Sequence, residues 1–116
     1  MEGSSCLFCR IASGELAATE VASDELVLAF RDINPQAPVH VLIIPRRHID
    51  HAGAILSGHA PELEAMFLMA SQVASLEGVA DSGYRLVFNV GEHALNSVPH
   101  LHMHLIGGKQ LGWPPG

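Results

Sequence analysis

The chain has 116 residues, of which 48% are hydrophobic and 16% charged, and its formal net charge is −6. This composition is typical of one globular domain and excludes an intrinsically disordered chain. Because nucleic-acid binding requires a basic surface, the excess of acidic residues argues against a nucleic-acid partner. No apolar run approaches the roughly 18 residues of a membrane span, and residues 1–5 lack the charged and apolar segments of a signal peptide.

We therefore expect a cytoplasmic protein without a membrane partner. A single domain should span residues 1–116. Within it we expect disorder in residues 1–5 and a C-terminal tail over residues 109–116.

The first half of the chain predicts one short helix and three strands. The helical spacing of the apolar residues at 7, 8, 11 and 12 predicts the helix, which Ser13-Gly14 would end. The expected strands are rich in apolar or β-branched residues and cover 19–23, 26–30 and 39–44. Residues 32–38 are expected to form a loop, because two prolines within four residues forbid a regular element.

The second half predicts one long helix and two further strands. The helix would begin at Ser57 or His59, with Pro61 in its first turn, and end at Gly78. Its apolar stripe should cover a sheet rather than bind a cofactor, and it consists of Leu63, Met66, Phe67, Ala70, Val73, Ala74 and Leu76. Strands are expected at 84–90 and 99–106. Strands clustered around one long helix indicate an α+β domain with an antiparallel sheet of about five strands.

The last expected strand contains three histidines that alternate with apolar residues. Alternation is the period of a half-buried strand, so His100, His102 and His104 would project from one face while residues 101, 103 and 105 face the core. At about 3.3 Å per residue, the imidazoles would line about 13 Å of one surface. Such a row could hold a phosphate with its leaving group, or a metal ion. A solvated polar face is the plain alternative, although histidine is rarely used in that way.

The stretch His-Leu-His-Met-His-Leu-Ile-Gly-Gly, at 100–108, resembles the motif of the histidine triad (HIT) family. Asp-Ile-Asn-Pro-Gln-Ala-Pro at 32–38 and Trp-Pro-Pro-Gly at 113–116 resemble its Hint branch, the nucleotide-binding proteins that hydrolyse nucleoside phosphoramidates. The resemblance runs from about Cys6 to the last residue. It implies a HIT-like α+β fold with one long and one short helix. It also implies a homodimer in which the tail, with Trp113, reaches the active site of the partner.

The chemistry expected of the histidines is attack on phosphorus. A neutral imidazole needs no prior deprotonation for this, and His102, which has a neighbour on each side, is the expected nucleophile. The resemblance assigns it the same role and implies that a main-chain carbonyl of the triad strand holds its far nitrogen protonated. His104 is expected to contact the phosphate and, as an imidazolium, to protonate a departing amine. His40 resembles a family histidine that reaches the same site, although a lone histidine between two valines is often an ordinary core residue.

The loop before the triad departs from the Gly-Gln-Ser pattern of the family. Leu95 replaces the glycine and Asn96 shortens the glutamine, which leaves substrate range and rate open. Ser97 is retained and could contact a phosphate. The resemblance implies a purine nucleotide site made by Phe8, Ile11, Asp32, Ile33, Asn34, Asn89, Leu95, Asn96, Ser97, His102, Met103 and His104. Asp32 would bind the ribose, whereas the three apolar residues around the base would otherwise be interpreted as ordinary core.

Two cysteines with Cys-x2-Cys spacing suggest half of a zinc site. Nothing suggests secretion, so a disulfide is not expected, and a thioredoxin-like redox pair would need a βαβ unit. Cys6, Cys9, His48 and His100 form a Cys2His2 set, which resembles a zinc site in the wider superfamily. The alternative is a pair of unligated cysteines with His48 at the surface. A catalytic zinc on the three triad histidines is disfavoured, because one strand places them too far apart for a single ion.

These observations predict a small dimeric hydrolase that cleaves the bond between a purine nucleoside monophosphate and an amine. Catalysis would pass through a nucleotidyl-His102 intermediate and require no cofactor, and any zinc would be structural. One alternative is a dinucleoside polyphosphate hydrolase of the same family, against which the Trp-Pro-Pro-Gly ending argues. The other is a nucleotide- or protein-binding module with little catalysis, which the altered loop at Leu95 and Asn96 makes conceivable.

Overall fold

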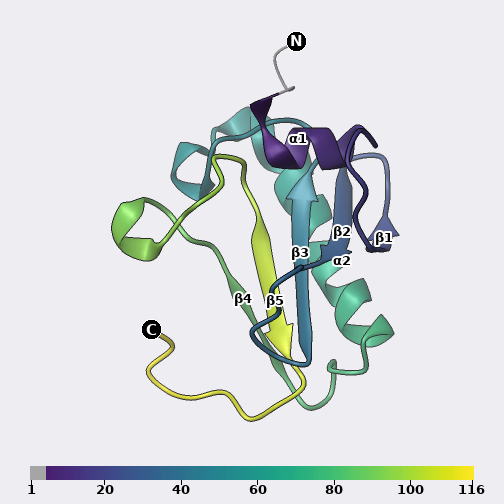
Figure 1. Ribbon diagram of the computed structural model, residues 1–116, viewed down its shortest axis with the longest axis vertical. Helices are drawn as coiled ribbons and strands as arrows, with labels where there is room; N and C mark the ends of the chain where they lie inside the picture. Colours follow the sequence, from purple (N-terminus) through teal and green to yellow (C-terminus); the bar gives the residue numbers. More distant parts are fainter. Residues whose placement is uncertain (1–4) are drawn as a thin grey trace.

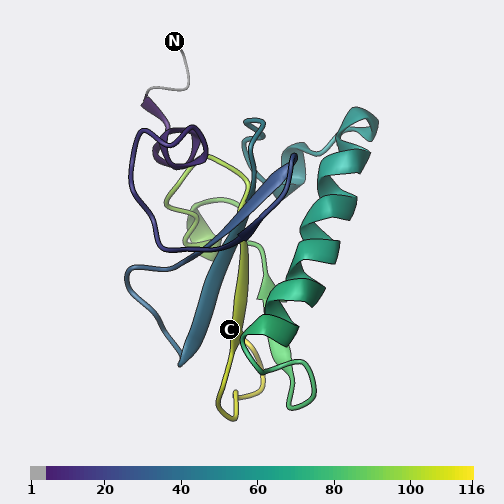
Figure 2. The same cartoon turned by 90° about the vertical axis from the view of Figure 1, so that its right-hand side faces the viewer.

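The computed structural model describes residues 5–116, which form a five-stranded sheet with a helix on each face (Figures 1 and 2). The helices and strands are α1 Leu7–Ala12, β1 Glu20–Ser23, β2 Val27–Arg31, β3 Val39–Pro45, α2 Ala60–Leu76, β4 Tyr84–Val87 and β5 Met103–Gly107. The strand order is β1-β2-β3-β5-β4, and every neighbouring pair is antiparallel. The predicted α+β class, with about five strands and one long and one short helix, is confirmed.

The central strand β3 is buried on both faces of the sheet. Val41 and Ile43 belong to the larger apolar core beneath α2, whereas Leu42 and Ile44 belong to a smaller core beneath α1. Figure 2 shows the sheet edge-on between the two helices. Alternate side chains of a strand point to opposite faces, so a strand covered on both sides needs a continuous apolar run. His40 therefore lies on the α1 face, with Leu42.

Helix α2 begins after His59 and ends before Gly78, whose φ of +75° favours glycine. Its buried stripe contains Met66, Ala70, Val73 and Ala74, as predicted. The prediction was wrong for Phe67 and Leu76, whose side chains are 51% and 59% exposed. Each residue advances about 100° around a helix, so Phe67 lies to the side of the stripe that Met66 begins.

The last two strands are shorter than predicted. β4 ends at Val87 rather than at residue 90, and β5 begins at Met103 rather than at Pro99. The His100 amide donates to Val98 O at 2.8 Å and the Leu101 amide to Ile49 O at 2.6 Å. Because these amides bond outside the sheet, the ladder between β3 and β5 begins only at Met103. Of the three triad histidines, only His104 lies within a regular strand.

Two further expectations concern the ends of the chain and membranes. The disorder expected for residues 1–5 falls, apart from Ser5, outside the described residues. The single domain with a tail from residue 109 stays a prediction. Within residues 5–116, no helix combines the length and apolar character that crossing a membrane requires.

Candidate active site

A cavity of about 420 Å³ opens on the α1 face of the sheet and reaches the last two triad histidines. Several residues predicted to bind a nucleotide line it, namely Phe8, Ile11, Asp32, Ile33, Ser97, His102 and His104. They come from α1, the loop after β2, the loop before the triad, and the triad itself. The side chain of Ile33 is fully exposed at this cavity. The tertiary fold thus brings together polar and apolar groups from four separate stretches of the chain.

The cavity has further walls that the sequence pattern did not indicate. These are Leu7, Leu16, Ala17, Phe30, Arg31, Leu42 and Val98. Leu42 could have been predicted to line the cavity, because it follows His40 by two residues on β3 and therefore lies on the same face of the strand. Leu16 and Ala17 lie in the irregular segment after α1, where no periodicity marks them.

Other predicted nucleotide-binding residues do not line this cavity. The side chain of Met103 is fully buried in the core beneath α2, because it alternates with His102 and His104. Asn89 and Leu95 line a second cavity, of about 820 Å³, which also contains Trp113. Leu95 is 84% exposed and has a φ of +63°, so this leucine adopts the left-handed conformation that favours glycine.

Asn34 and Asn96 are also not among the residues that line the cavity beside His102 and His104. The Asn34 amide donates to Asp32 Oδ1 at 2.8 Å, so Asn34 belongs to the turn that shapes the loop after β2. The Asn96 amide donates to Gly91 O at 3.1 Å and closes the loop before the triad. Both main-chain amides therefore help to set the shape of their loops.

His102 is held in a single orientation against the main chain. Its Nδ1 lies 2.7 Å from His100 O, and a carbonyl oxygen can only accept, so Nδ1 carries the proton and donates. Nε2 therefore keeps its lone pair. The ring is buried and meets the edge of Phe8 at a centroid distance of 5.1 Å. An imidazole in this tautomer, at the wall of a cavity, is equipped for nucleophilic attack.

His104 and His40 form a second pair of rings beside the cavity. His104 Nδ1 lies 2.9 Å from His40 Nε2. Burial, together with the neighbouring His102 and His40, lowers the pKa of His104 to about 4, although Asp32 opposes the shift. Burial also lowers the pKa of His40 below its ordinary value. These lowered pKa values favour the neutral form of both rings at neutral pH, and the expectation that His104 protonates a departing amine as an imidazolium stays a prediction.

The Cys2His2 residues converge on one side of α1. Their four donor atoms lie within 4.8 Å of one another. Cys6 Sγ lies 3.3 Å from His100 Nδ1, and Cys9 Sγ lies 3.3 Å from His48 Nδ1 and 3.5 Å from His100 Nδ1. Helix α1 places both sulfurs on one side, with Cys6 at the N-cap and Cys9 in the first turn. His100 thus faces the cysteines and not the triad cavity.

The surroundings of this cluster fit a zinc ion. His100 Nε2 donates to Pro45 O at 2.9 Å, and His48 Nε2 lies 2.9 Å from Asp50 Oδ1. Histidines that bind metals usually donate their second N–H to an oxygen in this way. Burial and, to a smaller extent, the neighbouring Cys6 thiol raise the pKa of Cys9 to about 11, so Cys9 is a thiol at neutral pH, and a metal ion that bound there would displace its proton.

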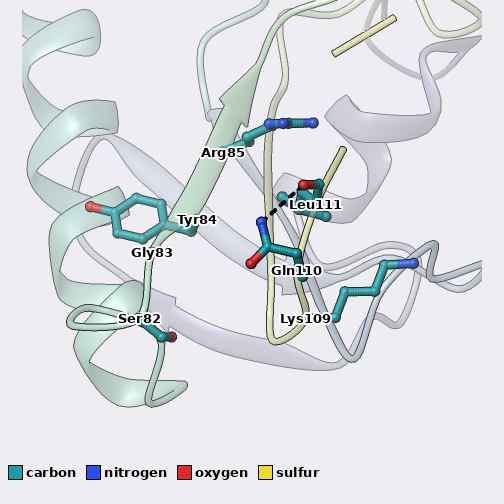
Figure 3. Close-up of a pocket in the computed structure, with 7 residues that line it drawn as sticks. All are labelled: Ser82, Gly83, Tyr84, Arg85, Lys109, Gln110 and Leu111. Carbon is teal, nitrogen blue, oxygen red and sulfur yellow. Dashed lines mark hydrogen bonds between the residues drawn. The ribbon is translucent and has the colours of Figure 1, made fainter. Parts of the chain in front are cut away.

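A smaller cavity, of about 210 Å³, lies where β4 begins and the C-terminal tail passes it, and no histidine is among the residues that line it (Figure 3). Tyr84 and Arg85 are consecutive on β4 and point to opposite sides of the strand. The Arg85 guanidinium donates to Gly112 O in the tail. The residues that line this cavity include none of those predicted to act in catalysis or binding, so it gives no support to a second active site.

A family model described as the HIT domain matches residues 13–111, which is most of the chain. The chain belongs to the HIT family. The match includes His40, His48 and the triad, and it begins after Cys6 and Cys9. The HIT family predicted from the triad motif is therefore confirmed.

Relatives of this HIT protein cover nearly its whole length. A 14 kDa zinc-binding protein from Zea mays is 45% identical over 118 residues, covering 100% of this chain and 91% of the relative. Purine nucleoside phosphoramidase from Escherichia coli strain K12 is 43% identical over 106 residues, covering 91% and 89%. The crystal structure of a HIT family hydrolase from Legionella pneumophila Philadelphia 1 superposes with a TM-score of 0.93 at 49% identity, covering 96% of this chain and 99% of that one. The fold is therefore the HIT fold.

Proposed function

We propose that the protein is a purine nucleoside phosphoramidate hydrolase with His102 as its nucleophile. The hydrogen bond from His102 Nδ1 to His100 O carries this proposal, because it leaves the Nε2 lone pair for attack on phosphorus. The cavity beside it has room for a nucleotide and is lined mostly by apolar side chains, with Arg31, Asp32 and Ser97 among its polar groups. Purine nucleoside phosphoramidase from Escherichia coli, at 43% identity, supports a substrate with a phosphorus–nitrogen bond.

The reaction would proceed in two displacements at phosphorus. In the first, His102 Nε2 bonds to phosphorus while the bond to the amine nitrogen breaks. That nitrogen keeps the electron pair and takes a proton from the solvent before it leaves. In the second, water attacks phosphorus, the bond to Nε2 breaks, and the nucleoside monophosphate departs as the water loses a proton. His102 thereby returns to its starting tautomer, held by His100 O.

The nucleotide would lie along the α1 face of the sheet. Phe8, Ile11 and Ile33 supply apolar surface for the purine, and the exposed side chain of Ile33 would be covered by it. Asp32 offers a carboxylate to the ribose hydroxyls. Ser97 offers a hydroxyl near the triad, where the phosphoryl group must sit for attack by His102.

We also propose that the four residues Cys6, Cys9, His48 and His100 hold a structural zinc ion. Two thiolates and two imidazoles are the donors that zinc prefers, and both histidines have the second-nitrogen contacts that metal ligands need. When bound, the ion would tie α1 to the segment after β3 and to the triad segment. The zinc-binding relative from Zea mays supports this assignment. The two chemical steps use only side chains and water.

A homodimer is the proposed assembly. β4 lies at one edge of the sheet, and an unpaired edge strand needs cover. Phe67, Leu68 and Leu76 on α2 and Trp113 in the tail are exposed apolar residues that a second copy could bury. Native mass spectra over a range of protein concentrations would report the dimer. The cytoplasmic location stays a prediction.

Intact-protein mass spectrometry after rapid quench with an adenosine 5′-phosphoramidate tests the hydrolase proposal. A transient gain of one nucleotidyl mass is expected in the wild type and in His59→Gln, a control histidine at the start of α2 that lies outside the cavity. His102→Ala should show no adduct. Nucleotide binding without adduct or turnover in the wild type would instead favour the binding module. Faster turnover of a dinucleoside polyphosphate would favour the other hydrolase.

A further inference from the structure

The loop between β2 and β3 aims a main-chain amide at His40. The Gln36 amide donates to His40 Nδ1 at 3.0 Å. The loop is tied to itself, because the Asn34 amide donates to Asp32 Oδ1 and the Gln36 side chain donates to Asn34 O at 2.9 Å. The Asp32 amide in turn donates to His40 O at 3.0 Å. Pro35 precedes Gln36 and Pro38 follows it two residues later. Because proline restricts the backbone, this segment holds the main-chain amide of Gln36 in place.

This amide determines which nitrogen of His40 carries the proton. An N–H can only donate, so His40 Nδ1 presents a lone pair and the proton of the neutral ring lies on Nε2. His40 Nε2 lies 2.9 Å from His104 Nδ1 and 3.4 Å from Asp32 Oδ2. Because His40 Nε2 donates, His104 Nδ1 accepts. The proton of His104 therefore lies on its own Nε2, the nitrogen left available to the cavity.

We propose that His40 is a positioning residue that holds His104 in the Nε2–H tautomer, so that His104 acts on the phosphoryl group as a neutral hydrogen-bond donor. His104 keeps its proton through both chemical steps. The carbonyl of His100 holds His102 in the opposite tautomer. Histidines two residues apart thus offer the same cavity a lone pair and an N–H. This inference rests on the proposed hydrolase function, and it explains the Asp-Ile-Asn-Pro-Gln-Ala-Pro motif as the support for one amide.

The same contacts argue against a metal ion at this place. Asp32, His40 and His104 offer donor atoms within 4.8 Å of one another, as a metal site would. A neutral histidine that binds a metal almost always donates its other N–H to an acceptor. The other nitrogen of His40 faces an amide donor, so Nε2 carries a proton and cannot ligate. In the cysteine cluster, by contrast, Nε2 of His48 and Nε2 of His100 each lie within hydrogen-bond distance of an oxygen, so Nδ1 of each ring can face the metal.

NMR of the imidazole nitrogens at neutral pH tests the tautomers without reference to activity. Shifts and couplings distinguish a protonated from an unprotonated ring nitrogen, and single-histidine variants assign the rings. We expect the proton of His104 on Nε2 in the wild type. His40→Gln should preserve this, because its side-chain amide can still donate to His104 Nδ1. His40→Leu removes the donor, so His104 should populate both tautomers. The control His59→Gln should leave the His104 signals unchanged.

Kinetics with the nucleoside phosphoramidate test the role of the tautomer. Because His104 then populates both tautomers and only the one with Nε2–H can donate to the phosphoryl group, His40→Leu should lower kcat a few-fold with little change in KM. His40→Gln should recover most of it, which a purely structural role would not predict. Thermal unfolding of both variants separates misfolding from misorientation.

Three outcomes would overturn the inference. They are a His104 proton on Nδ1 in the wild type, an imidazolium at His104 at neutral pH, and wild-type kcat in His40→Leu. If the wild type shows the expected tautomers but no turnover, the result supports the positioning of His104 by His40 and overturns the proposed hydrolase function instead.

Discussion

The main-chain oxygen of His100 lies 2.7 Å from Nδ1 of His102, two residues further along the chain. One residue therefore serves two sites, since the side chain of His100 faces Cys6 and Cys9 while its carbonyl holds His102, the proposed nucleophile. The two residues are close in sequence, but the contact depends on the irregular backbone at residues 100–102. This segment precedes Met103, where the pairing between β3 and β5 begins.

Removal of the nucleophile should nearly abolish turnover. We expect His102→Ala to lower kcat by about 10⁴-fold or more, because the remaining groups retain only part of catalysis. Nucleotide affinity should change little, since the apolar walls of the cavity remain. Steady-state kinetics and calorimetric titration with a nucleoside monophosphate measure the two quantities. A kcat within tenfold of the wild type would contradict the assignment of His102, and His59→Gln serves as the matched control.

The stability of the protein should decrease as the solution becomes acidic. Burial lowers the pKa of His104 to about 4 from an ordinary value of 6.5, and it lowers the pKa of His100 to about 4 as well. Such a histidine binds a proton more readily in the unfolded chain, so it contributes stability above about pH 6.5 that is lost as the pH falls towards 4. Urea unfolding across this range should show a falling midpoint. His104→Asn should have a shallower pH dependence, and an equally steep one would contradict the prediction.

Zinc should raise the unfolding temperature of the wild type. A ligand that binds only the folded chain, at about 100 times its Kd, adds about 2.7 kcal/mol to the free energy of unfolding. Cys9→Ser should lose this response, because it removes one of the four donors. Ser5→Ala, beside Cys6, is the control that should retain it. Calorimetric scans with and without zinc make the comparison, and the same rise in Tm for Cys9→Ser would argue against the proposed ligands.

Glycine at position 95 should be tolerated better than a β-branched residue. A left-handed φ costs a non-glycine residue about 1–2 kcal/mol, which glycine avoids at the expense of greater freedom in the unfolded chain. Leu95 has a φ of +63° and an exposed side chain, so little burial is lost. Leu95→Gly should therefore change the free energy of unfolding by less than about 1 kcal/mol. Leu95→Val should destabilise the chain by at least about 1 kcal/mol. Denaturant unfolding of both variants gives the values, and equal stability would rule out strain at this position.

Much of the candidate site could be predicted from the sequence. The last two triad histidines, Asp32 and the apolar residues of α1 were indicated by pattern or resemblance, and the structure places them around one cavity. Leu16 and Ala17 could not be found, because an irregular segment has no periodicity to show which side chains face inward. Met103 was expected at the nucleotide, but it lies in the core because a strand alternates its faces.

The sequence by itself determined the local elements, since helical and strand periods are properties of neighbouring residues. It indicated α1, the buried stripe of α2 and the apolar run of β3 for that reason. Only the tertiary structure decided which groups meet across the chain. It brings Cys6 beside His100, which is 94 residues away, and it places the Gln36 amide against His40. Whether an imidazole offers a lone pair or a proton depends on the donor or acceptor packed against it, and no periodic pattern in a sequence records that contact.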